Sequence, residues 1–241
     1  IKREKGDKDI TTQTLFPHAK KIKGFFVAKE RGILAGVEEI QFFLKTCTKL
    51  KYTFRKKDGA LLQDGDTFGA IEGDVREVLK VERAVMNFFG RMSGIATHAH
   101  RLVEKAKKIN PKIVVAPTRK TVWGLLDKKA CIVGGAGTHR LSLSDAVLIK
   151  DNHLAVAGGD IEHVLKMFQG KDVGRFLEVE VTIEAQALKA VRTFEELRFE
   201  CSRILLFDNF KPTLLKKTLS KIKKKYPKNK ILFEASGGIN E

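Results

Sequence analysis

The segment Ala146-Val147-Leu148-Ile149-Lys150-Asp151-Asn152-His153 joins an apolar run of strand length to a charged tip. The same pattern recurs at residues 112–116 before Thr118-Arg119-Lys120-Thr121, at 176–179 with Glu178 and Glu180, at 204–207 before Asp208-Asn209, and at 231–233 before Glu234-Ala235-Ser236-Gly237-Gly238. The carboxyl ends of parallel strands converge at one mouth of an α/β barrel. The repeated order of strand, polar tip and helix therefore predicts an α/β fold with a catalytic face built from these tips.

Segments with helical periodicity separate these predicted strands. They cover residues 124–133, 160–169, 183–199 and 212–226. Pro212 suits a first helical turn, where its missing N–H costs nothing. A closed barrel needs more strands than these five. We therefore expect residues 111–241 to form an incomplete, mostly parallel α/β barrel, with its last strands beyond Glu241.

The first part of the chain predicts a smaller α+β unit with its own sheet. The expected order is a strand at 23–29, a helix at 37–44, a strand at 51–55 and further short strands as far as Ile71. Asp74 is placed to cap a long helical segment, which Ser93-Gly94 is expected to interrupt and Asn110-Pro111 to end. We expect residues 1–110 to form an N-terminal α+β open-sandwich domain that includes these linking helices.

Composition places the chain among globular proteins. It has 241 residues, 43% of them apolar, and its longest apolar runs have only strand length, so we expect no membrane partner. The three cysteines, Cys47, Cys131 and Cys201, are far apart. So sparse a set argues against a disulfide framework and for a reducing compartment, which predicts a cytoplasmic protein.

A formal net charge of +17 is compatible with two kinds of partner. Lysines and arginines can bind nucleic acid by displacing counterions, or they can attract a small polyanionic substrate. The densest lysine cluster, residues 216–230, lies on a predicted helix whose apolar stripe is Leu215, Leu219, Ile222 and Tyr226. Its lysines fall mainly on the other faces, so we interpret them as a solvated surface and expect no nucleic-acid partner.

Six ordered motifs carry a family resemblance. They are Thr118-Arg119-Lys120-Thr121, Gly134-Gly135-Ala136-Gly137-Thr138-His139-Arg140, Asp145 with Lys150-Asp151-Asn152-His153, Glu178-Val179-Glu180, Phe207-Asp208-Asn209-Phe210 and Glu234-Ala235-Ser236-Gly237-Gly238. Together with upstream segments such as Asp9-Ile10-Thr11-Thr12, they make the chain similar over essentially its whole length to quinolinate phosphoribosyltransferases. That family is also called nicotinate-nucleotide pyrophosphorylase (carboxylating).

The resemblance implies a pentosyltransferase of NAD biosynthesis. Its reaction would transfer the phosphoribosyl group of phosphoribosyl pyrophosphate to quinolinate, giving nicotinate mononucleotide, pyrophosphate and CO₂. Both substrates are anionic, so fixed cations must offset their charge, and Mg²⁺ with oxygen ligands suits the leaving pyrophosphate. The ribosyl carbon becomes cation-like in the transition state, so nearby carboxylates stabilise it.

Basic residues at the predicted tips supply candidates for holding the substrates. The planar guanidinium of an arginine can form two parallel hydrogen bonds to a carboxylate, and the ammonium of a lysine is a compact positive charge that binds phosphate oxygens. By resemblance, Arg119 holds a quinolinate carboxylate, Lys120 holds phosphoribosyl pyrophosphate and is catalytic, and His139 and Arg140 contact the pyridine dicarboxylate. Lys150, also catalytic by resemblance, faces the carboxylate that is lost. A lysine that forms a Schiff base remains a rival interpretation for Lys150.

Acidic and glycine-rich tips supply the remaining candidates. Glu178 and Glu180 are two residues apart on a strand and point the same way, so one of them could instead form a structural ion pair. The motif favours Glu180, which with Asp208 is expected to be catalytic and to bind the metal and the ribose. Ser236, Gly237 and Gly238 are the candidate phosphate cradle, because a glycine-rich turn exposes backbone N–H donors.

Arg83 lies on the polar face of a predicted helix in the N-terminal part. By resemblance it reaches the neighbouring subunit's site, which implies a homodimer with shared active sites. Two alternatives stay open at this point. One is a related pyrophosphorylase-like protein of the molybdenum-transport type with a different acceptor. The other is a basic nucleic-acid-binding protein without catalysis, which would show a steep salt dependence of binding.

Overall fold

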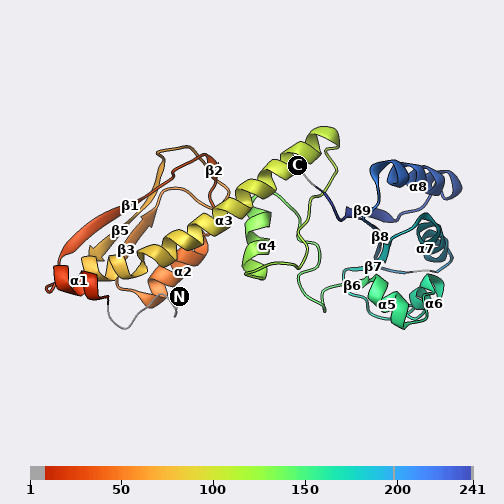
Figure 1. The fold of residues 1–241 in the computed structure, drawn as a ribbon, viewed down its shortest axis with the longest axis horizontal. Helices are drawn as coiled ribbons and strands as arrows, with labels where there is room; N and C mark the ends of the chain where they lie inside the picture. Colours follow the sequence, from red (N-terminus) through yellow and green to blue (C-terminus); the bar gives the residue numbers. More distant parts are fainter. Residues whose placement is uncertain (1–8, 198, 240–241) are drawn as a thin grey trace. The chain divides into compact units, whose positions relative to one another are not determined.

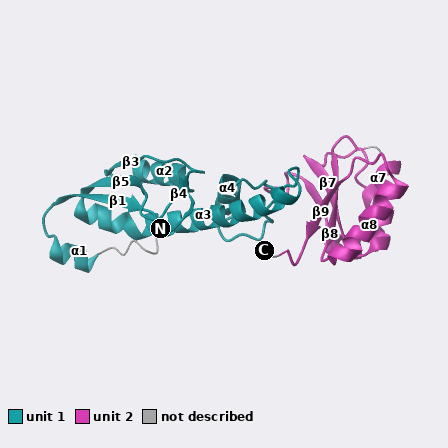
Figure 2. Ribbon diagram, turned by 90° about the horizontal axis from the view of Figure 1, so that it is seen from above, with its two compact units in different colours: residues 1–139 teal, residues 140–241 magenta. Residues whose placement is uncertain are grey.

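Helices and strands are described here for residues 9–197 and 199–239, the parts of the chain that the computed structural model places (Figure 1). These residues belong to two compact units, Ile1–His139 and Arg140–Glu241, which Figure 2 colours separately. We describe each unit by itself. In the described parts, no helix combines the length and the apolar character needed to cross a membrane.

Two antiparallel sheets and four helices make up the described part of the first unit. Its elements are α1 (Ile10–Leu15), β1 (Lys21–Val27), β2 (Gly32–Ile33), α2 (Val37–Cys47), β3 (Lys51–Phe54), β4 (Leu61–Leu62), β5 (Thr67–Asp74), α3 (Val75–Ile109) and α4 (Leu125–Val133). The larger sheet has the order β1-β5-β3, and β2 pairs with β4. The predicted N-terminal α+β architecture is therefore confirmed.

An aromatic cluster lies between the larger sheet and α3. The ring of Phe26 lies 5.5 Å from that of Phe54, 5.9 Å from that of Phe68 and 5.7 Å from that of Phe89. Phe26, Phe68 and Phe89 are buried together with apolar residues of α2 and α3. Offset and edge-to-face aromatic pairs of this kind add to the free energy gained by burying their area.

The predicted start and end of α3 are confirmed, but the predicted interruption is wrong. The Asp74 side chain caps the helix by accepting a hydrogen bond from the Arg76 N–H at 2.9 Å, and the helix ends at Asn110. Between them α3 runs unbroken for 35 residues. Ser93 does not break it, because its hydroxyl accepts from the Ala35 N–H at 3.0 Å. One turn later, Thr97 accepts from the Ile33 N–H at 2.8 Å.

The predicted strand at residues 112–116 is also wrong. This segment forms no ladder with any described strand, although Gly137 N–H donates to the Val115 carbonyl at 2.8 Å. Val114 is 74% exposed. Apolar character alone does not make a strand, because the backbone groups also need a paired neighbour. Residues 112–116 instead run beside the turn that follows α4.

Helix α4 belongs to the first unit because it packs on α3. Ala130 shares a buried cluster with Met92 and Ala96, and Leu126 and Val133 pack against the same cluster. The contacts within the chain therefore divide it after His139. The domain bounds expected from the sequence, 1–110 and 111–241, remain a prediction.

The second unit contains a parallel four-stranded sheet of order β6-β7-β8-β9. Its elements are β6 (Val147–Ile149), α5 (Asp151–Val156), α6 (Ile161–Lys166), β7 (Phe176–Val181), α7 (Glu184–Glu196), β8 (Ser202–Asp208), α8 (Pro212–Lys225) and β9 (Leu232–Ser236). Strand and helix alternate as expected for part of an α/β barrel. The predicted α/β class is thus confirmed, with four of the five expected barrel strands present in the described residues.

One face of this sheet packs against the helices. Ile149, Val179, Leu205 and Phe207 are buried in a common core with side chains from α5, α6, α7 and α8. These strand residues alternate with residues that point to the opposite face. The alternation therefore leaves Lys150, Glu180 and Asp208 on the face that the helices do not cover.

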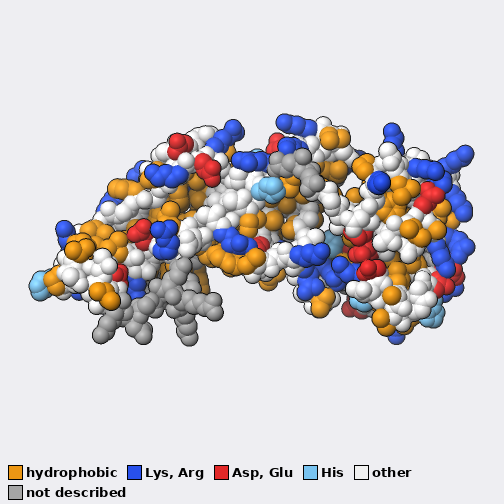
Figure 3. All heavy atoms as spheres, in the orientation of Figure 1, with side chains coloured by type: hydrophobic (Ala, Val, Ile, Leu, Met, Phe, Trp, Pro, Cys, Tyr) orange, Lys and Arg blue, Asp and Glu red, His pale blue; other side chains and the backbone are white. Residues whose placement is uncertain are grey.

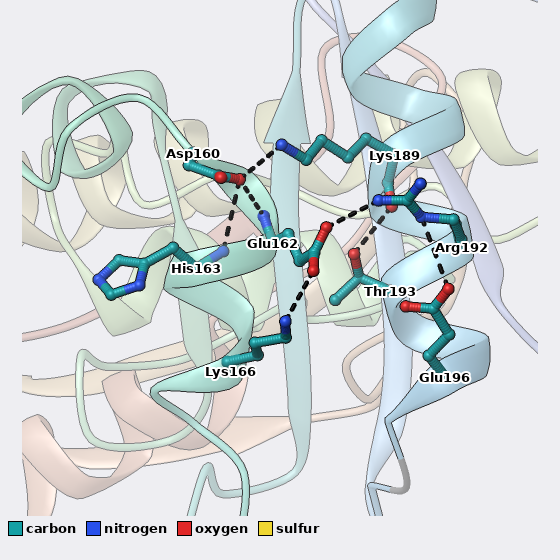
Figure 4. A network of polar contacts seen from close by, with 8 residues as sticks. All are labelled: Asp160, Glu162, His163, Lys166, Lys189, Arg192, Thr193 and Glu196. Carbon is teal, nitrogen blue, oxygen red and sulfur yellow. Dashed lines mark hydrogen bonds and ion pairs between the residues drawn. The ribbon is translucent and has the colours of Figure 1, made fainter.

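Ion pairs tie α6 to α7 on the outer side of the second unit (Figure 4). Lys189 lies 2.7 Å from Asp160, which caps α6, and Arg192 lies 2.7 Å from Glu162. Glu162 also pairs with Lys166 one turn along α6. Most of these side chains are exposed. We therefore interpret the network as a set of surface ion pairs that align the two helices, and not as a catalytic cluster.

Helix α8 has the predicted apolar stripe and basic outer faces. Leu215, Leu219, Ile222 and Tyr226 all pack in the core of the second unit. The lysines of residues 216–230 are exposed, and Figure 3 shows Lys and Arg side chains gathered over α8. This distribution supports the interpretation of these lysines as a solvated helix surface.

Candidate active site

The carboxyl edge of the four-stranded sheet collects polar residues from every strand. Lys150 follows β6, Glu180 lies near the end of β7, and Asp208 and Ser236 are the last residues of β8 and β9. The register places Glu180 beside Leu206 and Asp208 beside Ser236. Paired residues of parallel strands point to the same face, so these four residues share the uncovered face at one edge.

Lys150 and Glu180 form an ion pair across β6 and β7. The Lys150 Nζ lies 3.7 Å from the Glu180 Oε2, and the Glu180 side chain is only 11% exposed. Burial raises the pKa of the Glu180 carboxyl above its ordinary value. Lys150 opposes this rise in pKa, whereas the negative charges of Asp208 and Asp151 add to it. The folded protein therefore favours the charged form of Glu180 less than water does.

The oxygen donors at this edge fit a magnesium ion. Glu180 and Asp208 offer hard carboxylate ligands, the type that Mg²⁺ prefers. A cation beside Glu180 would favour the charged form of this carboxyl and so oppose the effect of burial on its pKa. The donor set would therefore suit such an ion, and the assignment of Glu180 and Asp208 as metal ligands stays a prediction.

Asn209 links the tips of β8 and β9, and the sequence analysis did not assign it a place in the site. Its N–H donates to the Ser236 carbonyl at 2.9 Å, and its side-chain amide donates to Asp208 Oδ2 at 2.8 Å. Asn209 has φ of 55°, a left-handed conformation that asparagine tolerates better than most residues. Its position directly after a strand-end aspartate was the available signal.

The turn after β9 requires glycine at position 237. Gly237 has φ of 82°, and a Cβ there would lie 2.2 Å from the Asn209 Oδ1. Gly238 also has a positive φ, of 63°, but a Cβ on it would meet nothing within 4 Å. Gly237 thus allows the two strand tips to lie close together. Gly238 leaves open space beside the turn.

The predicted basic residues of the first unit lie on loops and on α3. Arg119 and Lys120 are exposed in the loop 117–123, and Arg83 is exposed on α3. His139, at the end of the unit, is partly buried and has φ of 49°. Arg140 belongs to the second unit, where it is buried and its Nη1 lies 3.5 Å from the Ala146 carbonyl.

Two buried charged residues on α4 hold the loop 117–123, and the sequence analysis missed both. Asp127 accepts from the N–H groups of Val122 at 2.9 Å and Trp123 at 3.0 Å. Lys128 donates to the carbonyls of Pro117 at 3.2 Å and Thr138 at 2.6 Å. Adjacent acidic and basic residues on a short helix usually face solvent, so their pattern gave no sign of burial.

Family models match nearly the whole chain. Residues 9–93 match the quinolinate phosphoribosyl transferase N-terminal domain, and residues 95–241 match the C-terminal domain of the same family.

Individual proteins agree with this match. A probable nicotinate-nucleotide pyrophosphorylase (carboxylating) of Methanocaldococcus jannaschii is 39% identical, over 97% of this chain and 80% of the relative. A protein of the same description from Methanothermobacter thermautotrophicus is 33% identical, over 99% of this chain and 84% of the relative. The crystal structure of nicotinate-nucleotide pyrophosphorylase from Ehrlichia chaffeensis superposes with a TM-score of 0.85 at 27% identity, covering 99% of this chain and 83% of that one.

Proposed function

We infer that this chain, which belongs to the quinolinate phosphoribosyltransferase family, transfers a phosphoribosyl group to quinolinate in NAD biosynthesis. The products are nicotinate mononucleotide, pyrophosphate and CO₂. The observation that carries the proposal is the common edge at which Lys150, Glu180, Asp208 and Ser236 meet. That edge combines a cation, two carboxylates and a glycine-rich turn, the groups that this reaction requires.

We assign Glu180 and Asp208 to the ribosyl carbon and to Mg²⁺. When the bond from that carbon to pyrophosphate breaks, positive charge develops on the sugar, and a fixed carboxylate lowers the energy of this state. Bound Mg²⁺ would neutralise charge on the departing pyrophosphate. The partial burial of Glu180 supports this assignment, because charge interactions are stronger where water is excluded.

We assign Lys150 to the carboxylate that leaves as CO₂. Its loss places negative charge on the ring carbon until a proton arrives, and a nearby ammonium stabilises that charge. The Glu180 carboxylate, 3.7 Å from Lys150, supports an electrostatic role. We therefore favour this role over a Schiff base.

We assign the remaining predicted residues to substrate binding. Arg119, His139 and Arg140 would contact the carboxylates of quinolinate, and Lys120 would contact phosphoribosyl pyrophosphate as a catalytic cation. Ser236, Gly237 and Gly238 would bind phosphate. The positive φ angles of both glycines support this, because such turns direct backbone N–H groups toward an anion.

A homodimer with shared active sites and a cytoplasmic location complete the proposal. Arg83 is exposed on α3, as a residue that reaches a neighbouring subunit must be. Closed homodimers are also the commonest soluble oligomers, which supports this part of the proposal.

The alternative functions have less support. The relatives reported above carry carboxylating names, so a molybdenum-transport protein with another acceptor is not favoured. The lysines of α8 form a solvated face around a packed apolar stripe, which gives no reason to prefer nucleic acid.

The test is a product balance with quinolinate labelled in the carboxyl group that is lost. The purified protein with phosphoribosyl pyrophosphate and Mg²⁺ should release CO₂, pyrophosphate and nicotinate mononucleotide in equal amounts. Glu180→Gln should abolish most of this turnover, whereas Glu162→Gln, in the outer network of α6 and α7, should not. Product formation from nicotinate without CO₂ release would contradict the proposal.

A further inference from the structure

We propose that Lys128 is a positioning residue for the substrate-binding turns of the first unit. This inference rests on the proposed function, because it concerns the residues that would hold quinolinate and phosphoribosyl pyrophosphate. The ammonium of Lys128 joins the carbonyl of Pro117, two residues before Arg119, to the carbonyl of Thr138, directly before His139.

The burial of Lys128 makes these contacts specific. The residue is only 2% exposed, and its Nζ lies 3.2 Å from the Pro117 oxygen and 2.6 Å from the Thr138 oxygen. A buried ammonium costs much free energy unless acceptors surround it. Both carbonyls must therefore stay close to Lys128, so their two segments keep a fixed separation.

Asp127 holds the other end of the same loop. Its carboxylate accepts from the N–H groups of Val122 and Trp123. It also accepts from Nε and Nη2 of Arg91 on α3. Consecutive residues of α4 thus fix the loop 117–123 at its first and last residues. Arg119 and Lys120 lie exposed between these two anchors.

The segment that leads to His139 needs such an anchor. His139 has φ of 49°, a strained conformation for a residue other than glycine. Such conformations persist only where the surroundings enforce them. Gly137 N–H donates to the Val115 carbonyl, and a Cβ on Gly137 would lie 2.8 Å from Val114 Cγ1. The two segments are therefore in close contact, and Lys128 bonds to both.

The experiment compares Lys128→Met with Lys129→Met. Methionine keeps much of the lysine stem and removes the ammonium. Lys129 is the matched control because it lies on the same helix but pairs with Glu38 and Glu39, not with the loops. Melting temperature, kcat and KM for each substrate are measured for both variants. Emission of Trp123, the only tryptophan of the chain, reports the loop directly.

We expect Lys128→Met to raise the KM for quinolinate or phosphoribosyl pyrophosphate about 10-fold or more, since small misplacements of binding groups have effects of this size. Its Trp123 emission should shift. Lys129→Met should leave both KM values within about 2-fold of wild type, because its lost ion pairs are partly exposed. A purely structural role for Lys128 would change stability and leave KM alone.

Three outcomes would overturn the inference. A folded Lys128→Met with wild-type KM values would do so, as would equal KM changes in both variants. If Lys128→Met does not fold, the uncharged but polar Lys128→Gln decides: a folded glutamine variant with raised KM supports positioning, and one with wild-type KM refutes it. An inactive wild-type protein would instead count against the proposed function, so the two failures are distinguishable.

Discussion

Arg91 of α3 and Asp127 of α4 form a bidentate ion pair, with Nε to Oδ1 at 2.8 Å and Nη2 to Oδ2 at 2.6 Å. The guanidinium also lies 4.9 Å from the centroid of the Trp123 ring. Asp127 is buried and accepts two further backbone hydrogen bonds from Val122 and Trp123. One carboxylate therefore joins the long helix, α4 and the loop that carries Arg119.

Asp127→Asn should destabilise the protein by about 1.5–3 kcal/mol at pH 7, the range for hydrogen bonds that involve charged groups. The hydrogen bond from Arg91 lowers the pKa of Asp127 below its ordinary value, and the backbone bonds act in the same direction. A carboxyl whose pKa is lower in the folded state stabilises the fold above its unfolded pKa, and this stabilisation is lost on acidification.

The measurement is denaturant unfolding of wild type and Asp127→Asn between pH 7 and about pH 3. The difference in free energy of unfolding should shrink as the pH falls below about 4. Glu72→Gln, in the exposed pair with Lys21, is the control and should show little change at neutral pH. A difference for Asp127→Asn that is independent of pH would refute the electrostatic explanation.

Local patterns predicted the parts of the molecule that depend on local interactions. Asp74 caps α3 and Pro212 begins α8 as expected, because a cap or a first turn is decided within a few residues. The tips Lys150, Glu180 and Asp208 were also predicted, since each directly follows or ends an apolar strand. Their meeting at one edge followed from parallel pairing.

Features that depend on distant partners were not predicted. Residues 112–116 have the composition of a strand but no described neighbour with which to pair. Ser93-Gly94 resembles a helix break, yet Ser93 binds the backbone of Ala35, far away in the sequence. Lys128 is buried where the carbonyls of two loops, distant from each other in the sequence, accept from its ammonium.

Gly237→Ala should impair phosphate binding more than backbone strain at a positive φ alone would. A methyl group there would meet the Asn209 side chain, which is bonded to Asp208. Gly65 has a similar φ, of 80°, but a Cβ on it would have open space. Gly65→Ala is therefore the control for backbone strain, at about 1–3 kcal/mol.

The measurement is the KM for phosphoribosyl pyrophosphate together with the melting temperature of both variants. We expect Gly237→Ala to raise this KM about 10-fold or more, because misplaced binding groups have large effects, and Gly65→Ala to leave it unchanged. Equal stability losses with equal KM values would show that the contact with Asn209 has no functional consequence.

Glu180→Gln should stabilise the protein while reducing its activity. Burial raises the pKa of Glu180, so its charged form is less favourable in the folded state than in the unfolded state. A group whose folded pKa is raised contributes stability at low pH, and this is lost as the pH rises through that pKa. Glutamine carries no charge, so Glu180→Gln avoids this loss of stability. The variant should therefore be more stable than wild type at neutral pH and equally stable near pH 4.

We expect the free energy of unfolding of Glu180→Gln to rise by about 0.5–2 kcal/mol at pH 7, as at other sites that trade stability for function. Turnover should fall about 100-fold or more, the usual effect of removing a charge that stabilises a transition state. Urea titrations at pH 4 and 7 with parallel assays provide the measurement. Reduced stability at pH 7 would indicate that Glu180 has a structural role instead.

Mixing Arg83→Ala with Lys120→Ala tests the proposed shared active site. If Arg83 serves the neighbouring subunit, each heterodimer has one site with both residues intact and one site that lacks both. Random exchange between equal amounts would then restore about a quarter of the wild-type sites. Mixing Arg119→Ala with Lys120→Ala is the control, because these neighbours lie on one loop of one chain and no intact site can form. Activity in the first mixture that stays at the level of the separate variants, despite exchange shown by mass spectrometry, would exclude sharing through Arg83.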